Sequence, residues 1–328
     1  KLLEKIDRSI AMAGPEFHFE QFLGKGSFGS VSLFKYKGKR DGKTLYAAVK
    51  TSDDDSLCRE FQILSEFKGC SRIVQCYGTR VQRFNKDDQG STEYKINMEY
   101  APGGSLRSFI NRSKDRKLRD PTIRAFTRML LQGLCMIHGR GYVHCDLKPE
   151  NILVFPTCVY DKGAWRPSLE LKISDFGLSR RDGDSKWWRP RLPFAGTPIY
   201  MSPESVSHGE TKKGLDLWSL GCVVLEMYTG KRPWWHKNYD LEDLKNCYQP
   251  LIPSDLPSDA KHFIMTCFAL ETEDRKDAPT LLKHSFLRVE VSNTTKPQVS
   301  VKTDDRRKFA LELVKSRQRL LETRSICV

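Results

Sequence analysis

Long uninterrupted apolar stretches are missing from this sequence of 328 residues. The most apolar stretch, residues 215–228, is shorter than the roughly 20 residues that a membrane-crossing helix needs, and it carries Asp216 and Glu226. A basic and then apolar leader with a small-residue cleavage site is missing as well. We therefore expect no membrane partner, and a location in the cytoplasm with access to the nucleus.

The ten cysteines lack the spacing of metal or redox motifs. No two of them form a CxxC pair, and no series of Cys and His residues has zinc-finger spacing. Cys135, Cys222 and Cys267 lie within apolar stretches, which is typical of buried free thiols. We expect free thiols in a reducing compartment rather than a disulfide framework.

Acidic residues are outnumbered, with 41 Asp and Glu against 55 Lys and Arg, a formal net charge of +14. Such a positive field favours polyanions, so nucleotides, phosphorylated partners, acidic protein surfaces and nucleic acid must all be considered. The basic residues 302–324 are not interleaved with aromatic residues, as single-stranded nucleic-acid sites are. We interpret this tail as a packed helix or a solvated face, and we expect no nucleic-acid partner.

Apolar periodicity divides the chain into four parts. They are an N-terminal extension at residues 1–16, a small β-rich lobe with one helix at 17–100, a larger mainly helical lobe at 101–289 and a basic tail at 290–328. The helix of the small lobe is expected behind Ser52, where Leu57, Phe61 and Leu64 repeat at helical spacing. The sequence thus predicts an α+β architecture with two lobes.

In the larger lobe, several helices are expected. Asp120 and Pro121 are typical of an N-cap and first helical position, and the apolar stripe behind them continues to Gly139. Residues 215–228 are apolar nearly all round, which predicts a helix at the centre of the lobe. Further helices are expected at 241–248, 258–269 and 278–284. In the tail, Phe309, Leu313 and Leu320 repeat at helical spacing.

A glycine-rich segment follows the first expected strand. Its residues, GKGSFG, are Gly24, Lys25, Gly26, Ser27, Phe28 and Gly29. Glycines let a backbone approach phosphate groups closely, but a flexible turn explains the pattern about as well. Because residues 31–36 continue as a strand rather than a helix, the segment favours a hairpin over a dinucleotide-binding fold.

Lys50 ends an apolar strand and needs a counter-ion if its ammonium is buried. Glu60 on the following helix is the candidate partner. The alternative is a lysine at a solvated edge.

Residues 144–153, HCDLKPENIL, form the most informative segment. Asp146 precedes Lys148 by two residues and Asn151 by five, on an irregular loop before a short strand. Asp175, Phe176 and Gly177 follow. A carboxylate that orients a hydroxyl, a lysine for the transferred phosphate, and Asn and Asp oxygens for Mg²⁺ make a complete set for phosphoryl transfer.

Together these motifs resemble those of eukaryotic protein kinases, from about residue 17 to residue 287. The resemblance implies the bilobal kinase fold and the cofactors ATP and Mg²⁺. It implies that the glycine-rich segment covers the ATP phosphates, that Lys50 holds them while pairing with Glu60, and that Asn151 and Asp175 bind the metal. Asp146 would orient the substrate hydroxyl and Lys148 would steady the γ-phosphoryl group.

The resemblance also places the residues around the base. Those facing adenine or the hinge would be Val31, Ala48, Met98, Glu99, Ala101 and Leu153. Glu204 would pair with Arg275, Asp216 would anchor the catalytic loop, and His144 would support Phe176. The residues assigned to the phosphates, the metal and the base are expected to converge on one nucleotide.

Lys148 and the segment 196–200, GTPIY, resemble the serine/threonine pattern. The amino-acid sequences of the motifs resemble those of plant mitogen-activated protein kinase kinase kinases of the MEKK-like group. We therefore expect a protein substrate, namely a kinase one tier down a cascade, while the oligomeric state is left open. The alternatives are a pseudokinase scaffold that binds nucleotide or partners without turnover, and a small-molecule kinase.

Cys145 stands where these kinases usually carry an arginine that receives an activation-loop phosphate. We therefore expect activity to depend less on phosphorylation of that loop than in kinases that carry the arginine, with Ser185 as the residue to test. Arg180 and Arg181 are alternative phosphate ligands. Thr197 is expected to contact Asp146 and Lys148. The tryptophan pairs at 187–188 and 234–235 are interpreted as packing or as a docking surface.

Overall fold

The computed structural model describes residues 17–26, 29–37, 44–85, 91–161, 164–184, 196–209, 211–235, 249–272 and 274–288. These residues fall into two compact units that divide between Ala101 and Pro102. None of the described helices combines the length and apolar character needed to cross a membrane. The expected helix at 241–248, the N-terminal extension, Ser185, Trp187, Trp188 and the tail lie outside the described residues.

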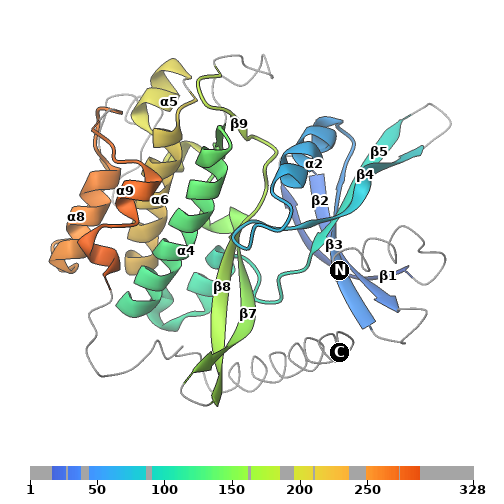
Figure 1. The fold of residues 1–328 in the computed structure, drawn as a ribbon, viewed down its shortest axis with the longest axis horizontal. Helices are drawn as coiled ribbons and strands as arrows, with labels where there is room; N and C mark the ends of the chain where they lie inside the picture. The colour runs from blue at the N-terminus through green and yellow to red at the C-terminus, as the bar shows by residue number, and fades with distance from the viewer. Residues whose placement is uncertain are drawn as a thin grey trace. The chain divides into compact units, whose positions relative to one another are not determined.

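The first unit is built on an antiparallel sheet of five strands (Figure 1). In spatial order the strands are β1 (Phe17–Gly26), β2 (Gly29–Lys37), β3 (Thr44–Ser52), β5 (Thr92–Glu99) and β4 (Cys76–Asn85). The strand that was predicted to follow the glycine-rich segment is β2, which pairs with both β1 and β3.

Within the described part of this unit, one helix, α2 (Ser56–Glu66), accompanies the sheet. Asp54 Oδ1 accepts the Ser56 N–H at 2.7 Å, which satisfies one of the free donors of the first helical turn. Leu57, Ile63 and Leu64 are buried. The predicted small β-rich lobe with one helix is therefore confirmed.

The second unit is mainly helical. The helices of its described residues are α3 (Leu106–Arg112), α4 (Asp120–Gly139), α5 (Pro203–His208), α6 (Lys213–Thr229), α8 (Ser258–Cys267) and α9 (Ala278–Leu281), with short 3₁₀ turns η1 (Lys114–Arg116), η2 (Pro149–Asn151), η3 (Pro198–Tyr200) and η4 (Ser285–Leu287). Every residue of α6 from Leu215 to Thr229 is buried, so this helix forms the core of the unit, as predicted.

Two small sheets complete the second unit. The strands β6 (Tyr142–Val143) and β9 (Arg180–Arg181) pair with each other, and β7 (Ile152–Asp161) pairs with β8 (Ala164–Ile173). The sequence predicted only a short strand after the loop that contains Asp146 and Asn151. This was wrong, because β7 and β8 pair over ten positions. The resulting hairpin extends well beyond the helices at one end (Figure 1).

The start of α4 also differs by one residue from the prediction. Arg119 is the N-cap, and Asp120 is already helical. The Asp120 carboxylate accepts the Arg124 Nε–H at 2.6 Å and the Tyr228 hydroxyl, so it serves side-chain partners instead of capping the helix.

Candidate functional site

A buried ion pair lies in the first unit. Lys50 Nζ on β3 lies 2.6 Å from Glu60 Oε2 on α2, and both residues are buried. Val31 on β2, the strand that follows the glycine-rich segment, stands opposite Lys50 on β3. The predicted pairing is confirmed, and it holds the ammonium of Lys50 in a fixed position.

The glycine-rich turn depends on Gly29. Its φ of +126° is open to glycine but strained for other residues, and an added Cβ would lie 2.0 Å from the Thr51 carbonyl oxygen. Gly24 stands opposite Val31, Lys25 opposite Ser30, and Gly26 opposite Gly29. Ser27 and Phe28 lie outside the described residues.

The residues expected around the base occupy neighbouring positions of one sheet. Ala48 on β3 stands directly opposite Met98 on β5, and both are buried. The Glu99 N–H donates to the Gln75 carbonyl at 3.0 Å, and Glu99 Oε1 accepts the Gln75 N–H at 2.8 Å. These bonds fix the strand end that leads to the buried Ala101. Leu153 belongs to the second unit, on β7.

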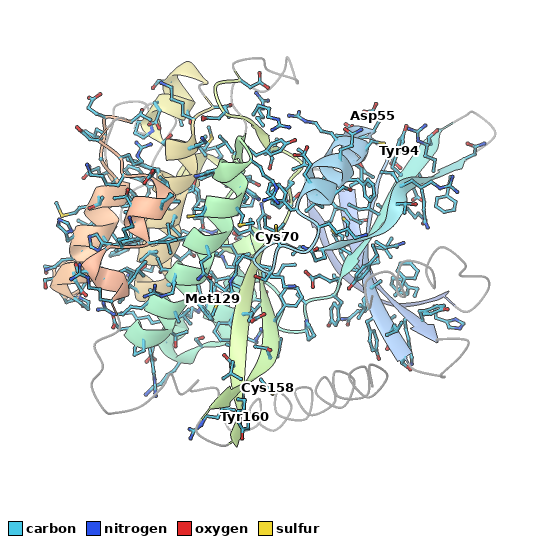
Figure 2. The ribbon with its side chains drawn as sticks, in the orientation of Figure 1. Asp55, Cys70, Tyr94, Met129, Cys158 and Tyr160 are labelled. Carbon is cyan, nitrogen blue, oxygen red and sulfur yellow. The ribbon has the colours of Figure 1, made fainter. Side chains whose placement is uncertain are left out.

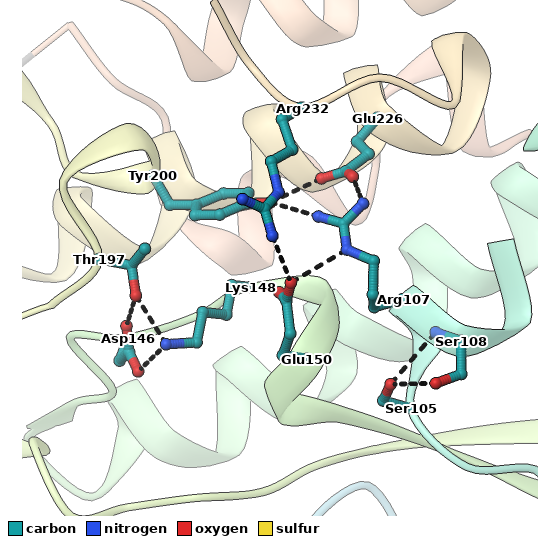
Figure 3. Close-up of polar contacts among 10 residues, drawn as sticks. All are labelled: Ser105, Arg107, Ser108, Asp146, Lys148, Glu150, Thr197, Tyr200, Glu226 and Arg232. Carbon is teal, nitrogen blue, oxygen red and sulfur yellow. Dashed lines mark hydrogen bonds and ion pairs between the residues drawn. The ribbon is translucent and has the colours of Figure 1, made fainter. Parts of the chain in front are cut away.

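In the second unit, Asp146 stands at the centre of a tight polar cluster (Figure 3). Lys148 Nζ donates to Asp146 Oδ2 at 2.7 Å and to Thr197 Oγ1 at 2.6 Å, while Thr197 Oγ1 donates to Asp146 Oδ1 at 2.8 Å. Asn151 Nδ2 donates to Oδ2 and to the carbonyl of Asp146, each at 2.9 Å. The predicted contacts of Thr197 are confirmed, and the carboxylate is held in one orientation.

The backbone of the catalytic loop is held from the centre of the unit. Asp216 of α6 is fully buried and accepts the N–H of His144 at 2.8 Å and of Cys145 at 3.0 Å. His138 Nε2, at the end of α4, lies 2.8 Å from the same carboxylate. The anchoring role predicted for Asp216 is confirmed. His138 was missed, because the only signal was a polar residue beside the buried Ile137.

Asn151 and Asp175 present the donor set that a magnesium ion uses. The Ser174 N–H donates to the Asn151 carbonyl at 2.9 Å, so the residue before Asp175 is bonded directly to Asn151. Since the Asn151 amide nitrogen faces Asp146, its side-chain oxygen points away from that carboxylate. Among the described residues, no three His, Cys, Asp or Glu side chains gather as a metal site. An amide and a carboxylate oxygen completed by phosphates and water suit Mg²⁺.

The backbone at Asp175 is unusual. Its φ of 65° is left-handed, which is costly for a residue other than glycine and is typical of functional sites. His144 stabilises the neighbourhood: its Nδ1 accepts the Asp146 N–H, so its Nε2–H donates to the Ser174 carbonyl at 3.0 Å. The His144 ring also packs edge-on against Phe176 at 5.0 Å, as predicted.

A further network was missed by the sequence analysis (Figure 3). Arg107 Nε donates to Glu150 Oε1 at 3.0 Å, and its Nη2 donates to the Tyr200 hydroxyl at 2.8 Å. The Tyr200 hydroxyl in turn donates to Glu226 Oε2 at 2.7 Å, and Arg107 also pairs with this fully buried carboxylate. Arg107 therefore links α3, the segment after Thr197, and the core helix α6.

The predicted brace between Glu204 and Arg275 is confirmed. Arg275 Nη1 lies 2.6 Å from Glu204 Oε1, and the Arg275 side chain is fully buried. Arg275 also donates to the Ala269 carbonyl at 2.8 Å, which ties the start of α5 to the segment behind α8.

Cys145 is a buried thiol with a left-handed φ of 68°. Burial, with Asp216 nearby, raises its pKa well above the usual value, so the thiol is neutral and unsuited to binding a phosphate. Of the alternative ligands, Arg181 donates to the Arg140 carbonyl and lies over the Tyr142 ring, whereas Arg180 is buried beside Cys145.

The cysteines and the second tryptophan pair can be compared with their interpretations from the sequence. The eight cysteines of the described segments are free thiols. Trp234 is buried, as the packing interpretation expected, while Trp235 is partly exposed with the Lys231 ammonium 3.5 Å from its ring centre.

Comparison with known proteins bears on the whole of this arrangement. The family model for the protein kinase domain matches residues 17–287. The chain is 33% identical over 299 residues to the mitogen-activated protein kinase kinase kinase 20 of Arabidopsis thaliana, covering 88% of this chain and 83% of that protein. It is 32% identical to kinase kinase kinase 3 of the same plant, covering 85% and 44%, and 32% identical to its mitogen-activated protein kinase kinase 1, covering 88% and 78%.

The chain belongs to the protein kinase family. Its activity is that of a protein serine/threonine kinase. The family implies ATP as the phosphate donor, a divalent metal ion and a protein substrate. The predicted α+β kinase fold is thereby confirmed.

Proposed function

We propose that this kinase acts as a mitogen-activated protein kinase kinase kinase, with a kinase one tier down the cascade as its substrate. The proposal is supported by the likeness to several plant proteins of that name over most of the chain. The observation that carries the catalytic part is the orientation of Asp146 by Lys148, Asn151 and Thr197.

In the proposed reaction, Asp146 accepts a hydrogen bond from the substrate hydroxyl and orients it towards the γ-phosphorus. Lys148 stands 2.7 Å from Asp146, and it stabilises the negative charge on the transferred group. Lys50 holds the α- and β-phosphates while Glu60 keeps the ammonium in place. Asn151 and Asp175 hold Mg²⁺, which neutralises phosphate charge when bound. Positioning and charge stabilisation account for the chemistry without a covalent enzyme intermediate.

Phosphate transfer to a generic protein substrate tests the catalytic assignment. Asp175→Ala is expected to lower kcat by at least about a hundredfold, since a metal ligand is lost. Asp255→Ala removes an exposed loop carboxylate and is the matched control, expected to retain wild-type activity. Equal background transfer by wild type and Asp175→Ala would instead indicate a scaffold without turnover.

Substrate choice tests the cascade position. Catalytically inactive forms of mitogen-activated protein kinase kinases are offered beside inactive mitogen-activated protein kinases and a generic basic protein. We expect the first group to be phosphorylated with a kcat/KM at least about tenfold higher, a difference of about 1.4 kcal/mol. Equal rates for all three would contradict the cascade assignment while leaving the kinase activity intact.

A further inference from the structure

The hairpin of β7 and β8 carries an apolar row along its full length. From Trp165 to Ile173, apolar and polar residues alternate strictly in β8, which is the pattern of a strand with one buried face. The apolar positions of β8 stand opposite alternate positions of β7. The five opposed pairs are Ile152 with Ile173, Val154 with Leu171, Pro156 with Leu169, Cys158 with Pro167, and Tyr160 with Trp165.

The structure buries only the first part of this row. At the base of the hairpin, Ile152 and Ile173 are fully buried, because β8 packs against α4. Burial decreases towards the far end, where Pro167 is exposed and Tyr160 is 65% exposed. Figure 2 shows Cys158 and Tyr160 on the part of the hairpin that extends beyond the helices. The sequence is thus patterned for a buried face, and among the described residues the far half of the hairpin stays largely exposed.

The cover is better supplied by a helix on the face than by a strand at the edge. Each strand of the hairpin contains a proline, Pro156 in β7 and Pro167 in β8. Proline lacks the N–H that an added strand would need, and natural sheets use it to protect their edges from further pairing. The apolar row itself remains available for an apolar helix stripe.

The sequence itself predicts such a helix beyond the last described residue, in the basic tail. The turn η4 ends the described chain on α4, where Arg124 Nη1 donates to the Phe286 carbonyl at 2.6 Å and Arg128 donates to the Leu287 carbonyl. The hairpin base lies on this same helix, and the far end of the hairpin points to the side where α4 starts (Figure 1). The described chain therefore ends on the helix that also carries the base of the hairpin.

The tail has the apolar pattern and the length that are needed to cover the far end of the hairpin. Phe309, Leu313 and Leu320 fall within about 40° of one another on a helix, so they form one narrow apolar stripe. A random coil as long as the connection between Arg288 and Phe309 has a mean end-to-end distance of about 25 Å. The connection is therefore almost as long as the whole of α4, a helix of 20 residues and about 30 Å.

We propose that residues 309–320 form a helix that covers the apolar row at the far end of the hairpin, with Cys158, Tyr160 and Pro167 as its contact surface. In this proposal the far end of the hairpin binds the chain's own tail. Its contact residues are not among those assigned to catalysis or to nucleotide binding. This assignment does not depend on the proposed cascade position.

Amide hydrogen exchange of the full chain tests the proposal. Leu313→Asp is expected to speed exchange in the far half of the hairpin, residues 157–161 and 164–168, by about tenfold, because the cover is lost and this half opens locally. Gln318→Asp is the matched control, since it adds the same charge to the opposite side of the tail helix and is expected to change nothing there. Exchange at residues 152–155 should be equal in all three proteins.

The reciprocal variant keeps the test independent of the tail mutation. Tyr160→Asp is expected to speed exchange in residues 309–320, whereas Arg166→Asp, on the other face of the hairpin, is not. Unchanged exchange in both Leu313→Asp and Tyr160→Asp would overturn the proposal. So would protection of the hairpin that varies with protein concentration, because the cover would then be a second copy of the chain.

Discussion

Lys50 and Glu60 show at the residue scale how a cation is kept in a buried place. Their side chains are 7% and 1% exposed, and the two charged atoms are 2.6 Å apart. Removing both charges from water costs several kcal/mol per ion, and mutual attraction often does little more than offset this. The pair is therefore better explained by the need for a fixed ammonium than by stability.

Separating stability from activity at this pair gives the first prediction. Glu60→Leu leaves a buried ammonium without its counter-ion and is expected to lower the free energy of unfolding by about 3–5 kcal/mol. The double variant Lys50→Met with Glu60→Leu should recover most of this stability but no phosphate transfer. Urea denaturation and a transfer assay measure the two effects. Recovery of activity in the double variant would contradict the role given to Lys50.

Cys145 gives the second prediction. Because its buried thiol stays neutral, it offers no charge to an activation-loop phosphate. Ser185→Ala is therefore expected to reduce kcat/KM by less than about tenfold, below the 1.5–3 kcal/mol of a charge-assisted hydrogen bond. Thr197→Ala, which breaks contacts to Asp146 and Lys148, should cost far more and serves as the comparison. A loss above about a hundredfold for Ser185→Ala would contradict this expectation.

The sequence predicted the charged pairs of the site but not all of their partners. Lys50, Asp146 and Asp175 stand in motifs whose order and spacing indicate their chemistry, so they were found directly. Arg107 stands in no such motif, and only folding brings it to Glu150 and Glu226. Short motifs predict which residues act together within one segment. Contacts between helices that are distant in the sequence depend on packing, which a short motif does not predict.

At the scale of elements, α6 and α8 pack so closely that one glycine decides their separation. A Cβ added at Gly221 would lie 2.8 Å from Cys267 Cβ and 2.8 Å from the Phe268 ring. Backbone atoms of a packed interior have little room to move, so the helices would have to separate.

Gly221→Ala is therefore expected to lower the free energy of unfolding by about 1–3 kcal/mol. Gly139→Ala is the control, because a Cβ at this last residue of α4 meets no atom within 4 Å. There the better helix propensity of alanine should raise stability by about 0.5–1 kcal/mol. Chemical denaturation of the three proteins measures the difference, and equal loss in both variants would show that the close contact is not the cause.

A histidine pair makes the contact between α8 and η4 sensitive to pH. His284 Nδ1 accepts the Phe286 N–H at 3.1 Å, so its Nε2–H donates to His262 Nδ1 at 2.7 Å. Burial and the neighbouring His262 lower the pKa of His284, although Asp259 acts in the opposite direction. The unfolded chain therefore binds a proton more readily than the folded one, and stability falls as the pH drops below about 6.5.

The fourth prediction uses this pair. His262→Gln keeps an acceptor for His284 but adds no charge at low pH, so the loss of stability between about pH 7 and pH 5 should become smaller. His18→Gln, which changes an exposed histidine of β1 outside this pair, is the comparison. Thermal unfolding across this pH range provides the measurement. An unchanged pH dependence in His262→Gln would rule out the pair as its source.

At the scale of the whole molecule, the sequence predicted the order of its parts better than their extents. Apolar periodicity found the small sheet with its helix and the buried helix α6, because both patterns are local and continuous. The hairpin was underestimated, since proline and glycine residues such as Pro156, Gly163 and Pro167 are typical of the end of a strand in a sequence. The expected convergence of all nucleotide contacts on one ATP stays a prediction, and each unit is described by itself.

The carboxylate of Asp216 has a consequence for how such an enzyme can change over time. It fastens the backbone at residues 144 and 145 from inside the core, independently of their neighbours along the chain. Insertions, altered loops and new surface charges can therefore accumulate around the reactive groups without displacing them. The exterior of the unit, and with it the choice of target, can thus vary while the reactive groups keep their places.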